Sequence, residues 1–162
     1  LLPVEVALMP GGGTFTLTGK LGEVMQESAK AALSFLRANH KTYGLKKDFF
    51  RNLEVHIHIP EGAVPKDGPS AGITMATALL SALTKKPVKP GYAMTGEVTL
   101  SGKLLPIGGL NEKVLAAKQA GIQQILLPKK NEKDLAELPG ELKEGLTFHK
   151  LDTLVEAFKL VL

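Results

Sequence analysis

The feature that most limits how this chain can fold is an abrupt change of pattern between residues 53 and 83. Apolar and polar side chains alternate over 53–59, as they do in a strand with one buried face. A loop rich in proline and glycine follows at 60–69, and residues 70–83 then form an almost continuous apolar run. We therefore expect a half-buried strand and a helix over about 70–83, joined by a turn that proline and glycine force.

The rest of the chain places strands first and then alternates strands with helices. Apolar side chains alternate on both sides of three consecutive glycines within 3–18, which favours a hairpin or strand pair. Helices are expected at 22–43, 110–120, 131–138 (capped by Asn131) and 152–160, and strands within 93–107 and at 122–127 and 146–149. This order indicates one domain over residues 1–162, of mixed α/β type and nearer α+β than doubly wound.

Composition excludes several kinds of chemistry. The chain has no cysteine, which rules out disulfides, thiolate catalysis and zinc–thiolate sites and fits a reducing compartment. The formal net charge is +4, but the lysines are scattered without aromatic residues between them, which favours a solvated surface over a nucleic-acid groove. The longest apolar stretch, 73–83, is interrupted by hydroxyl residues and is too short to span a bilayer.

Residues 13–21 look at first like a phosphate-binding loop but do not meet its requirements. That loop needs four residues between its glycines and a serine or threonine after the lysine. Here five residues separate Gly13 from Gly19, and Leu21 follows Lys20. We therefore expect no nucleotide site in these residues.

His56 and His58 lie two positions apart on the expected strand, so both side chains project from one face. The pair could bind a metal, but no third ligand stands at a suggestive spacing, and a polar strand face is the simpler interpretation. A catalytic triad of Ser70, either histidine and Asp67 also stays open, because geometry rather than chain order defines a triad.

Ser70 stands in the segment Pro65–Gly72 (PKDGPSAG), directly before the apolar helical run. Free backbone N–H groups point outward at a helix N-terminus, so this position suits a nucleophile that generates an oxyanion. A plain helix cap is the alternative. Two other serine–lysine neighbours are expected on the surface: Ser28 with Lys30, and Ser101 with Lys103.

Four motifs resemble the proteolytic domain of the Lon ATP-dependent proteases. They are PKDGPSAG at 65–72, MTGEVTL at 94–100, LPIGGL at 105–110 (followed by Glu112 and Lys113), and LGEVMQES at 21–28. The likeness covers nearly the whole chain, and the octapeptide is highly specific. The resemblance implies the Lon proteolytic-domain fold over residues 1–162 and a serine endopeptidase that uses a serine–lysine dyad and an acyl-enzyme.

The resemblance also implies the roles of individual residues. Ser70 would be the nucleophile and Lys113 its base, while Thr95 would donate or accept a hydrogen bond that orients the lysine amine. To these we add the backbone N–H groups of Gly68 and Ala71 as candidates for an oxyanion hole.

Lys113 can act as a base only as the neutral amine, which an apolar setting favours. On the expected helix, its neighbours one turn away are small or apolar: Gly109, Leu110, Ala116 and Ala117. The adjacent Glu112 is about 100° around the helix. Asp67 has two candidate roles, as the cap of the helix that begins near Ser70 or as an ion-pair partner that holds Lys113 charged in an idle state.

The resemblance further implies that these residues are one part of a longer ATPase–protease, and the chain does open at Leu1 inside an apparent strand. The ATPase module would lie outside them, so ATP and magnesium are expected there and no cofactor here. The implied partners are unfolded or damaged polypeptides and identical subunits in a hexameric ring. The implied setting is cytoplasmic protein quality control without membrane association.

Two other functions stay open beside the peptidase. One is a non-catalytic assembly domain, similar to Lon-like domains of DNA-repair ATPases that have lost the dyad, although this chain retains Ser70 and Lys113. The other is a histidine-dependent serine hydrolase, which would depend on His56 or His58 instead of Lys113.

Overall fold

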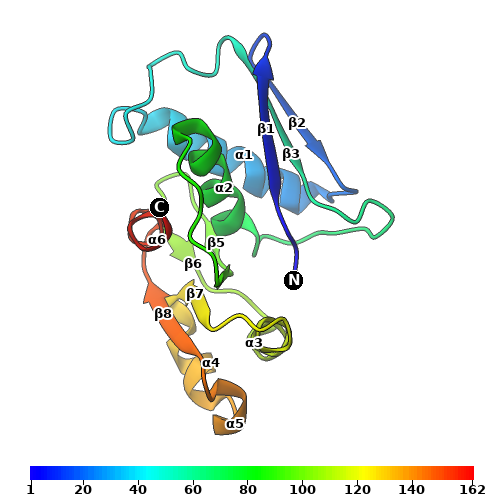
Figure 1. The fold of residues 1–162 in the computed structure, drawn as a ribbon, viewed down its shortest axis with the longest axis vertical. Coiled ribbons are helices and arrows are strands. Elements are labelled where there is room, and N and C mark those ends of the chain that lie inside the picture. The colour runs from blue at the N-terminus through cyan, green and yellow to red at the C-terminus, as the bar shows by residue number, and fades with distance from the viewer.

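Three strands in the N-terminal part form the first sheet of the computed structural model, which describes residues 1–162 (Figure 1). They are β1 (Glu5–Pro10), β2 (Thr14–Thr18) and β3 (Leu53–His58), in the order β1-β3-β2. β3 pairs antiparallel with β1 and parallel with β2. The predicted alternation in β3 is confirmed, because Val55 and Ile57 are fully buried and the residues between them are only half-buried.

The two strands predicted within 3–18 are confirmed as β1 and β2, but their pairing as a hairpin or strand pair is wrong. β1 and β2 belong to one sheet but do not pair with each other, because β3 lies between them. Alternating side chains identify a strand and its buried face, but they do not identify its partner. In the central position, β3 bonds its backbone groups along both edges, as a strand with fully buried side chains requires.

The second sheet contains β4 (Tyr92–Met94), β7 (Gln124–Pro128) and β8 (Thr147–Leu151), all parallel, in the order β4-β7-β8. β7 is central, and residues 125–128 are all buried, as expected of a parallel strand covered on both faces. Between β4 and β7 along the chain, β5 (Glu97–Val98) and β6 (Leu104–Leu105) form a short antiparallel pair. The strands expected in this half are confirmed with slightly shifted ends.

Six helices pack around the two sheets. They are α1 (Glu23–Ala38), α2 (Gly72–Thr84), α3 (Leu110–Gln119), α4 (Glu132–Glu137), α5 (Gly140–Lys143) and α6 (Leu154–Val161). The helix predicted over 22–43 ends early at Ala38, where the Asn39 side chain donates a hydrogen bond to the Phe35 carbonyl. The other predicted helices are confirmed, and α5 had no counterpart among them.

Asn131 is fully buried but does not cap α4 with its side chain, so that prediction is wrong. Its amide instead bonds both backbone groups of Ile107, since Oδ1 accepts from the N–H and Nδ2 donates to the carbonyl, each at 2.9 Å. Nδ2 also donates to Asp134 at 2.8 Å. The buried amide therefore joins the segment before α3 to the start of α4.

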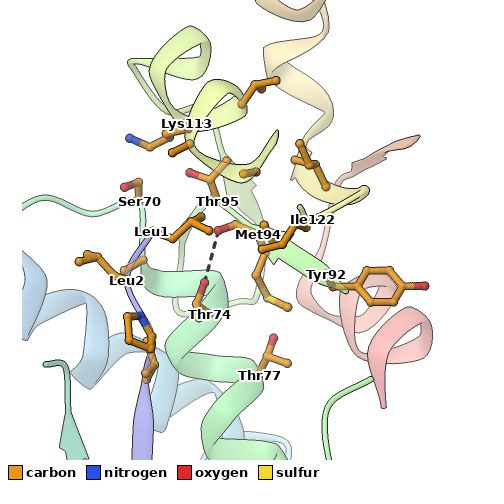
Figure 2. Close-up of a pocket in the computed structure, with 18 of the residues that line it drawn as sticks. Leu1, Leu2, Ser70, Thr74, Thr77, Tyr92, Met94, Thr95, Lys113 and Ile122 are labelled. Atoms are coloured by element: carbon orange, nitrogen blue, oxygen red, sulfur yellow. Dashed lines mark hydrogen bonds between the residues drawn. The ribbon is translucent and has the colours of Figure 1, made fainter. Parts of the chain in front are cut away.

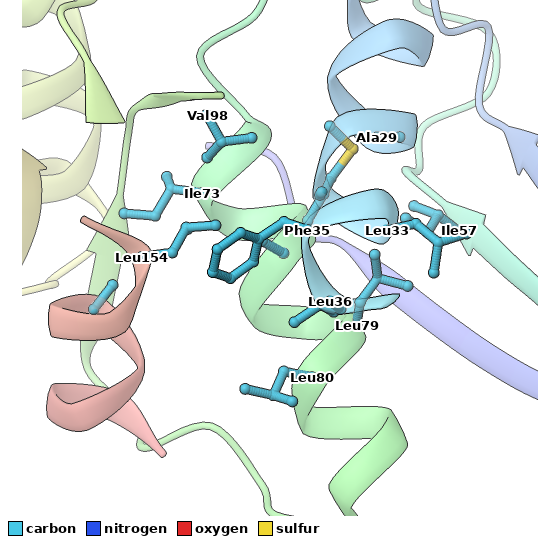
Figure 3. Close-up of a cluster of buried hydrophobic side chains, with 14 of the residues drawn as sticks. Ala29, Leu33, Phe35, Leu36, Ile57, Ile73, Leu79, Leu80, Val98 and Leu154 are labelled. Atoms are coloured by element: carbon cyan, nitrogen blue, oxygen red, sulfur yellow. The ribbon is translucent and has the colours of Figure 1, made fainter. Parts of the chain in front are cut away.

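The main core lies between α1, α2, α6 and the buried face of the first sheet (Figure 3). α2 is apolar around most of its circumference, and Ile73, Met75 and Leu79 are fully buried. Figure 3 shows Phe35 of α1 among side chains of α2 and Leu154 of α6. A smaller cluster packs α3 and α4 against β7: Leu110, Val114, Ala117, Ile125, Leu127 and Leu135.

This arrangement confirms the expected α+β class. The first sheet is mixed, the second is parallel, β5 and β6 form a separate antiparallel pair, and helices pack against both larger sheets (Figure 1). None of the helices combines the length and the apolar character that crossing a bilayer requires.

Leu154 and Val155 test which face of α6 supports the fold. Leu154 is fully buried, whereas 37% of Val155 is exposed. Leu154→Ala is expected to lower the free energy of unfolding by about 2–5 kcal/mol, because it removes apolar contacts and leaves a cavity. Val155→Ala should lower it by less than about 1 kcal/mol. Urea unfolding followed by circular dichroism measures both, and equal losses would contradict the packing of α6.

Candidate functional site

Ser70, Thr95 and Lys113 line one pocket of about 670 Å³ (Figure 2). They come from different elements, since Ser70 precedes α2, Thr95 follows β4, and Lys113 lies near the start of α3. Figure 2 shows the Ser70 hydroxyl and the Lys113 side chain at the same end of the pocket. The fold thus brings together three polar residues that the sequence analysis singled out.

The remainder of the pocket is mostly apolar, with 15 hydrophobic residues among the 22 that line it. They come from the N-terminal segment, α2, β4, α3 and the start of β7, and include Leu2, Ala78, Met94, Leu110, Ala116 and Ile125. Such a pocket can take an apolar side chain beside a small number of polar reacting groups.

Backbone hydrogen bonds fix Ser70 and Thr95 relative to each other. The Gly96 N–H donates to the Ser70 carbonyl at 2.9 Å, and the Ile73 N–H donates to the Gly96 carbonyl at 3.1 Å. The Thr95 N–H donates to the Leu126 carbonyl at 3.0 Å, which extends the pairing of β4 with β7. The start of α2 is therefore attached to the residues that follow β4.

Ser70 does not cap a helix. α2 begins at Gly72, Ala71 occupies its N-cap position, and no side chain accepts a capping hydrogen bond. Ser70 is half-buried and lines the pocket. The plain-cap alternative is therefore wrong.

Lys113 is half-buried in the setting that the sequence predicted. Leu110, Ala116 and Ala117, its neighbours one turn away, line the same pocket. Gly109 stands at the N-cap of α3 with a φ of +69°, a left-handed conformation that favours glycine. The Lys113 N–H donates to the Gly109 carbonyl at 3.2 Å, so this turn sets where the lysine side chain begins.

Glu112 is a pocket residue that sequence reasoning missed, because the helix geometry turns it away from Lys113. A Cβ at Gly109 would lie 3.5 Å from Glu112 Oε2 and 3.8 Å from Lys113 Nζ, so both side-chain ends reach the same region. Within 4.0 Å, however, the protein has a single ion pair, which joins Lys150 and Glu132. The position of Glu112 depends on how a flexible side chain bends, which residue spacing does not show.

Thr95 Oγ1 is buried and has no hydrogen-bond partner. The bond to Lys113 that the resemblance implied is thus absent from this conformation, and the orienting role of Thr95 stays a prediction. A buried hydroxyl without a partner costs about 1–3 kcal/mol of stability. Buried polar side-chain atoms without a partner are uncommon in folded proteins, and Tyr43 Oη is the other one in this chain.

Asp67 binds the start of α1 instead of α2 or Lys113. Its Oδ1 accepts hydrogen bonds from the Met25 N–H at 3.0 Å and from the Gly68 N–H at 2.9 Å. These bonds, that of Met25 first, hold the pKa of Asp67 below its usual range. The carboxylate therefore lies at the positive end of α1. The predicted cap of α2 is wrong, and the predicted ion pair with Lys113 is absent from this conformation.

Gly22 makes this contact possible, because a Cβ at that position would collide with the Asp67 carboxyl carbon. The Gly22 N–H also donates to the Lys66 carbonyl at 2.7 Å. The residues that begin α1 therefore hold the loop that leads to Ser70.

The two N–H groups predicted to form an oxyanion hole differ in this conformation. The Gly68 N–H already donates to Asp67 Oδ1. The Ala71 N–H, at the N-cap of α2, has no acceptor among the backbone groups. An oxyanion beside Ser70 would thus meet the Ala71 donor first, and the roles of both groups stay predictions.

Ser28 is buried, so the prediction that it lies on the surface is wrong. Its hydroxyl donates to the Pro69 carbonyl in a long bond of 3.4 Å, and it would lie 2.7 Å from a Cβ at Gly72. Helical spacing could have found it, because Ser28 shares the buried face of α1 with Ala32. Lys30, Ser101 and Lys103 are exposed as predicted.

His56 and His58 do not belong to the pocket. Thr18 Oγ1 lies 2.7 Å from His56 Nε2 and 2.7 Å from His58 Nδ1, so both rings bond one threonine on the face of the first sheet. The polar-face interpretation is confirmed. No group of three histidine, aspartate or glutamate side chains could hold a metal ion, and the triad of Ser70, Asp67 and a histidine does not assemble.

Comparison with known proteins gives a match along the entire chain. Residues 1–162 fit the family described as the Lon protease (S16) C-terminal proteolytic domain. The Lon proteases of Solibacter usitatus and Nitratidesulfovibrio vulgaris are each 57% identical to it, over 100% and 96% of this chain. Lon protease 1 of Thermus thermophilus is 55% identical over 99%. The chain spans only about a fifth of the length of these relatives, 20%, 19% and 20%.

The Asp67 carboxylate should make the stability of the fold depend on pH. Because its pKa is lowered in the folded state, its contribution is complete above the ordinary aspartate pKa near 4. That contribution is lost as the pH falls from about 4 through the lower pKa of the folded state. Asp67→Ala is therefore expected to lower the midpoint of urea unfolding at pH 7, with the difference from the parent shrinking at pH 3.

Asp48→Ala is the matched control, because Asp48 is an exposed carboxylate for which no such hydrogen bonds are present. Its unfolding midpoint should equal that of the parent at both pH values. A difference between Asp67→Ala and the parent that is as large at pH 3 as at pH 7 would contradict a role for the charge.

Proposed function

Because this chain belongs to the family of Lon protease C-terminal proteolytic domains, we propose that it is a serine-type endopeptidase with Ser70 as nucleophile and Lys113 as base. The observation that carries the proposal is that both residues line one pocket from separate elements. The pocket also offers an apolar wall for a substrate side chain.

In the proposed reaction, Ser70 Oγ attacks the carbonyl carbon of a peptide bond while the neutral Lys113 amine accepts the hydroxyl proton. The resulting tetrahedral oxyanion accepts a hydrogen bond from the Ala71 N–H. The Gly68 N–H supplies a second bond if the Asp67 carboxylate releases it.

The C–N bond then breaks, and the Lys113 ammonium gives its proton to the leaving amine. An ester of Ser70 with the acyl half of the substrate remains. Water attacks this ester as Lys113 again accepts a proton, which it returns to Ser70 Oγ when the acid leaves. The proton balance closes after each cycle, and the reaction needs no cofactor in these residues.

The apolar lining supports a preference for substrates that expose hydrophobic side chains. In folded proteins such side chains are mostly buried, whereas unfolded or damaged chains present them. We therefore propose unfolded or damaged polypeptides as substrates.

The chain's share of its relatives supports a place within a longer protein. We propose that it is the proteolytic part of an ATP-dependent Lon protease, in a homo-oligomeric and most simply hexameric ring. ATP and magnesium would bind a module outside these residues, and the setting would be cytoplasmic protein quality control. A purely structural assembly domain would need neither Ser70 nor Lys113, and both line the pocket.

Substitution of the dyad gives the direct test. Ser70→Ala and Lys113→Met are each expected to lower kcat/KM for an apolar fluorogenic peptide at least about a thousandfold, because each removes a group that acts in the bond-breaking step. A phosphonate probe that reacts with activated serines should label the parent at Ser70, identified by mass spectrometry, and should fail to label either variant.

Ser101→Ala and Lys103→Ala are the matched controls, because they change an exposed serine and lysine elsewhere in the chain. Both should cleave the peptide at the parental rate. Peptide cleavage that survives Lys113→Met but disappears in His56→Ala would favour the histidine-dependent alternative and overturn the dyad.

Thr95→Val tests whether the buried hydroxyl serves the lysine. Valine has the same shape without the unpaired Oγ1, so the free energy of unfolding should rise by about 1 kcal/mol. If Thr95 orients Lys113 during the reaction, kcat should fall about tenfold, the value of one hydrogen bond. Thr95→Ser, which retains the hydroxyl, should keep kcat near that of the parent. An undiminished kcat in Thr95→Val would exclude the orienting role.

A further inference from the structure

Lys66 is a buried lysine outside the pocket, with only 7% of its surface exposed. Its Nζ donates to three backbone carbonyls, those of Gly19 at 2.8 Å, Glu61 at 2.5 Å and Val64 at 2.8 Å. A lysine ammonium has three N–H donors, so all of its hydrogen-bonding capacity is used. No carboxylate lies within 4.0 Å of it. The charge is therefore compensated by carbonyl dipoles alone.

These three carbonyls belong to two segments that are far apart in the sequence. Gly19 follows β2, whereas Glu61 and Val64 belong to the loop between β3 and α2. Ile59 is fully buried where this loop leaves β3, but residues 61–65 are all exposed, so none of their side chains attaches this stretch. The buried ammonium thus attaches the exposed stretch 61–65 to Gly19, in the segment that follows β2.

The main chain of Lys66 reinforces the attachment. Its N–H donates to the Lys20 carbonyl at 3.0 Å, and its carbonyl accepts from the Gly22 N–H at 2.7 Å. The next residue, Asp67, binds the start of α1, and Ser70 follows three positions later. The ammonium, the main chain and the carboxylate together form an anchor directly before the proposed nucleophile.

We infer that Lys66 is a positioning residue for Ser70, with its ammonium filling a cradle of three carbonyls so that the loop enters the pocket in one conformation. The inference rests on the proposed function for its catalytic part. Without the ammonium, three carbonyls that converge on one point would repel one another and the loop would move. Because the apolar wall of the pocket lies on other elements, substrate binding would change little while the attack by Ser70 slowed.

Chemical rescue can test the inference. Lys66→Ala removes three methylenes and the ammonium, and n-propylammonium added to the solution has the matching length and charge. We expect kcat to fall about tenfold to a hundredfold with KM within about twofold of the parent. Millimolar n-propylammonium should restore kcat, and it should lower hydrogen–deuterium exchange over 60–72, which the substitution raises.

Three further variants give the experiment its controls. Lys66→Met retains the stem without the charge, so its kcat should be low and n-propylammonium should not restore it. Lys47→Ala changes an exposed lysine outside the anchor and should behave as the parent in every measurement. Val161→Ala removes fully buried side-chain atoms from α6, which makes none of the anchor's hydrogen bonds. It should lower the free energy of unfolding but leave kcat unchanged at temperatures at which the variant is folded.

Each outcome decides one point. A parental kcat in Lys66→Ala, or a loss of kcat matched by Val161→Ala at equal stability, overturns the positioning role. If the parent itself lacks peptidase activity that depends on Ser70, the proposed function fails, and the exchange data alone then decide whether Lys66 holds the loop. Unchanged exchange over 60–72 overturns the cradle. If Lys66→Ala folds only when n-propylammonium is present, that dependence supports the cradle of three carbonyls.

Discussion

The polar groups of the loop between β3 and α2 need partners if the loop is to hold Ser70 in place, and residues 19–28, which lead into α1, provide most of those outside the loop. Lys66, Asp67 and Pro69 each bond a residue of the segment 19–28. The positive end of α1 favours the Asp67 carboxylate, and Gly22 leaves the space that this side chain occupies. Since residues 61–65 are all exposed, the course of the loop after the buried Ile59 depends on these polar contacts.

The other side of the pocket depends on a different set of contacts. Gly96 bonds both Ser70 and Ile73, which attaches α2 to the residues after β4, and β7 supports that strand from the centre of the second sheet. α3, which carries Lys113, packs on β7 through the smaller apolar cluster. Serine and lysine are thus carried by two packing units that meet along β4, and the pocket lies where they meet.

The local sequence pattern predicted helices, strands and their buried faces, which depend on residues a few positions apart. It missed strand pairing and hydrogen bonds between residues far apart in the sequence. The alternation in β3, the apolar course of α2 and the setting of Lys113 follow from spacings of two to four residues. The partner of β1 does not, because the residues of β3 that pair with it lie 43 to 53 positions downstream, from Pro10↔Leu53 to Glu5↔His58. The same reason explains Asp67, whose partner Met25 is 42 residues away, and Ser28, which is buried against the Ser70 loop. The motifs identified the family, but only the three-dimensional structure shows the hydrogen bonds of Asp67 and Lys66 and the unpartnered hydroxyl of Thr95.

The distance in sequence between α1 and the Ser70 loop has a consequence for biosynthesis. Contacts that close spans of 41 to 47 residues form more slowly than helices and turns, because the chain must first lose the entropy of a large closed loop. The geometry around Ser70 is therefore among the last features that a newly made chain acquires. The proposed nucleophile therefore takes its working position only in the folded domain, so topology itself delays its chemistry until folding is complete.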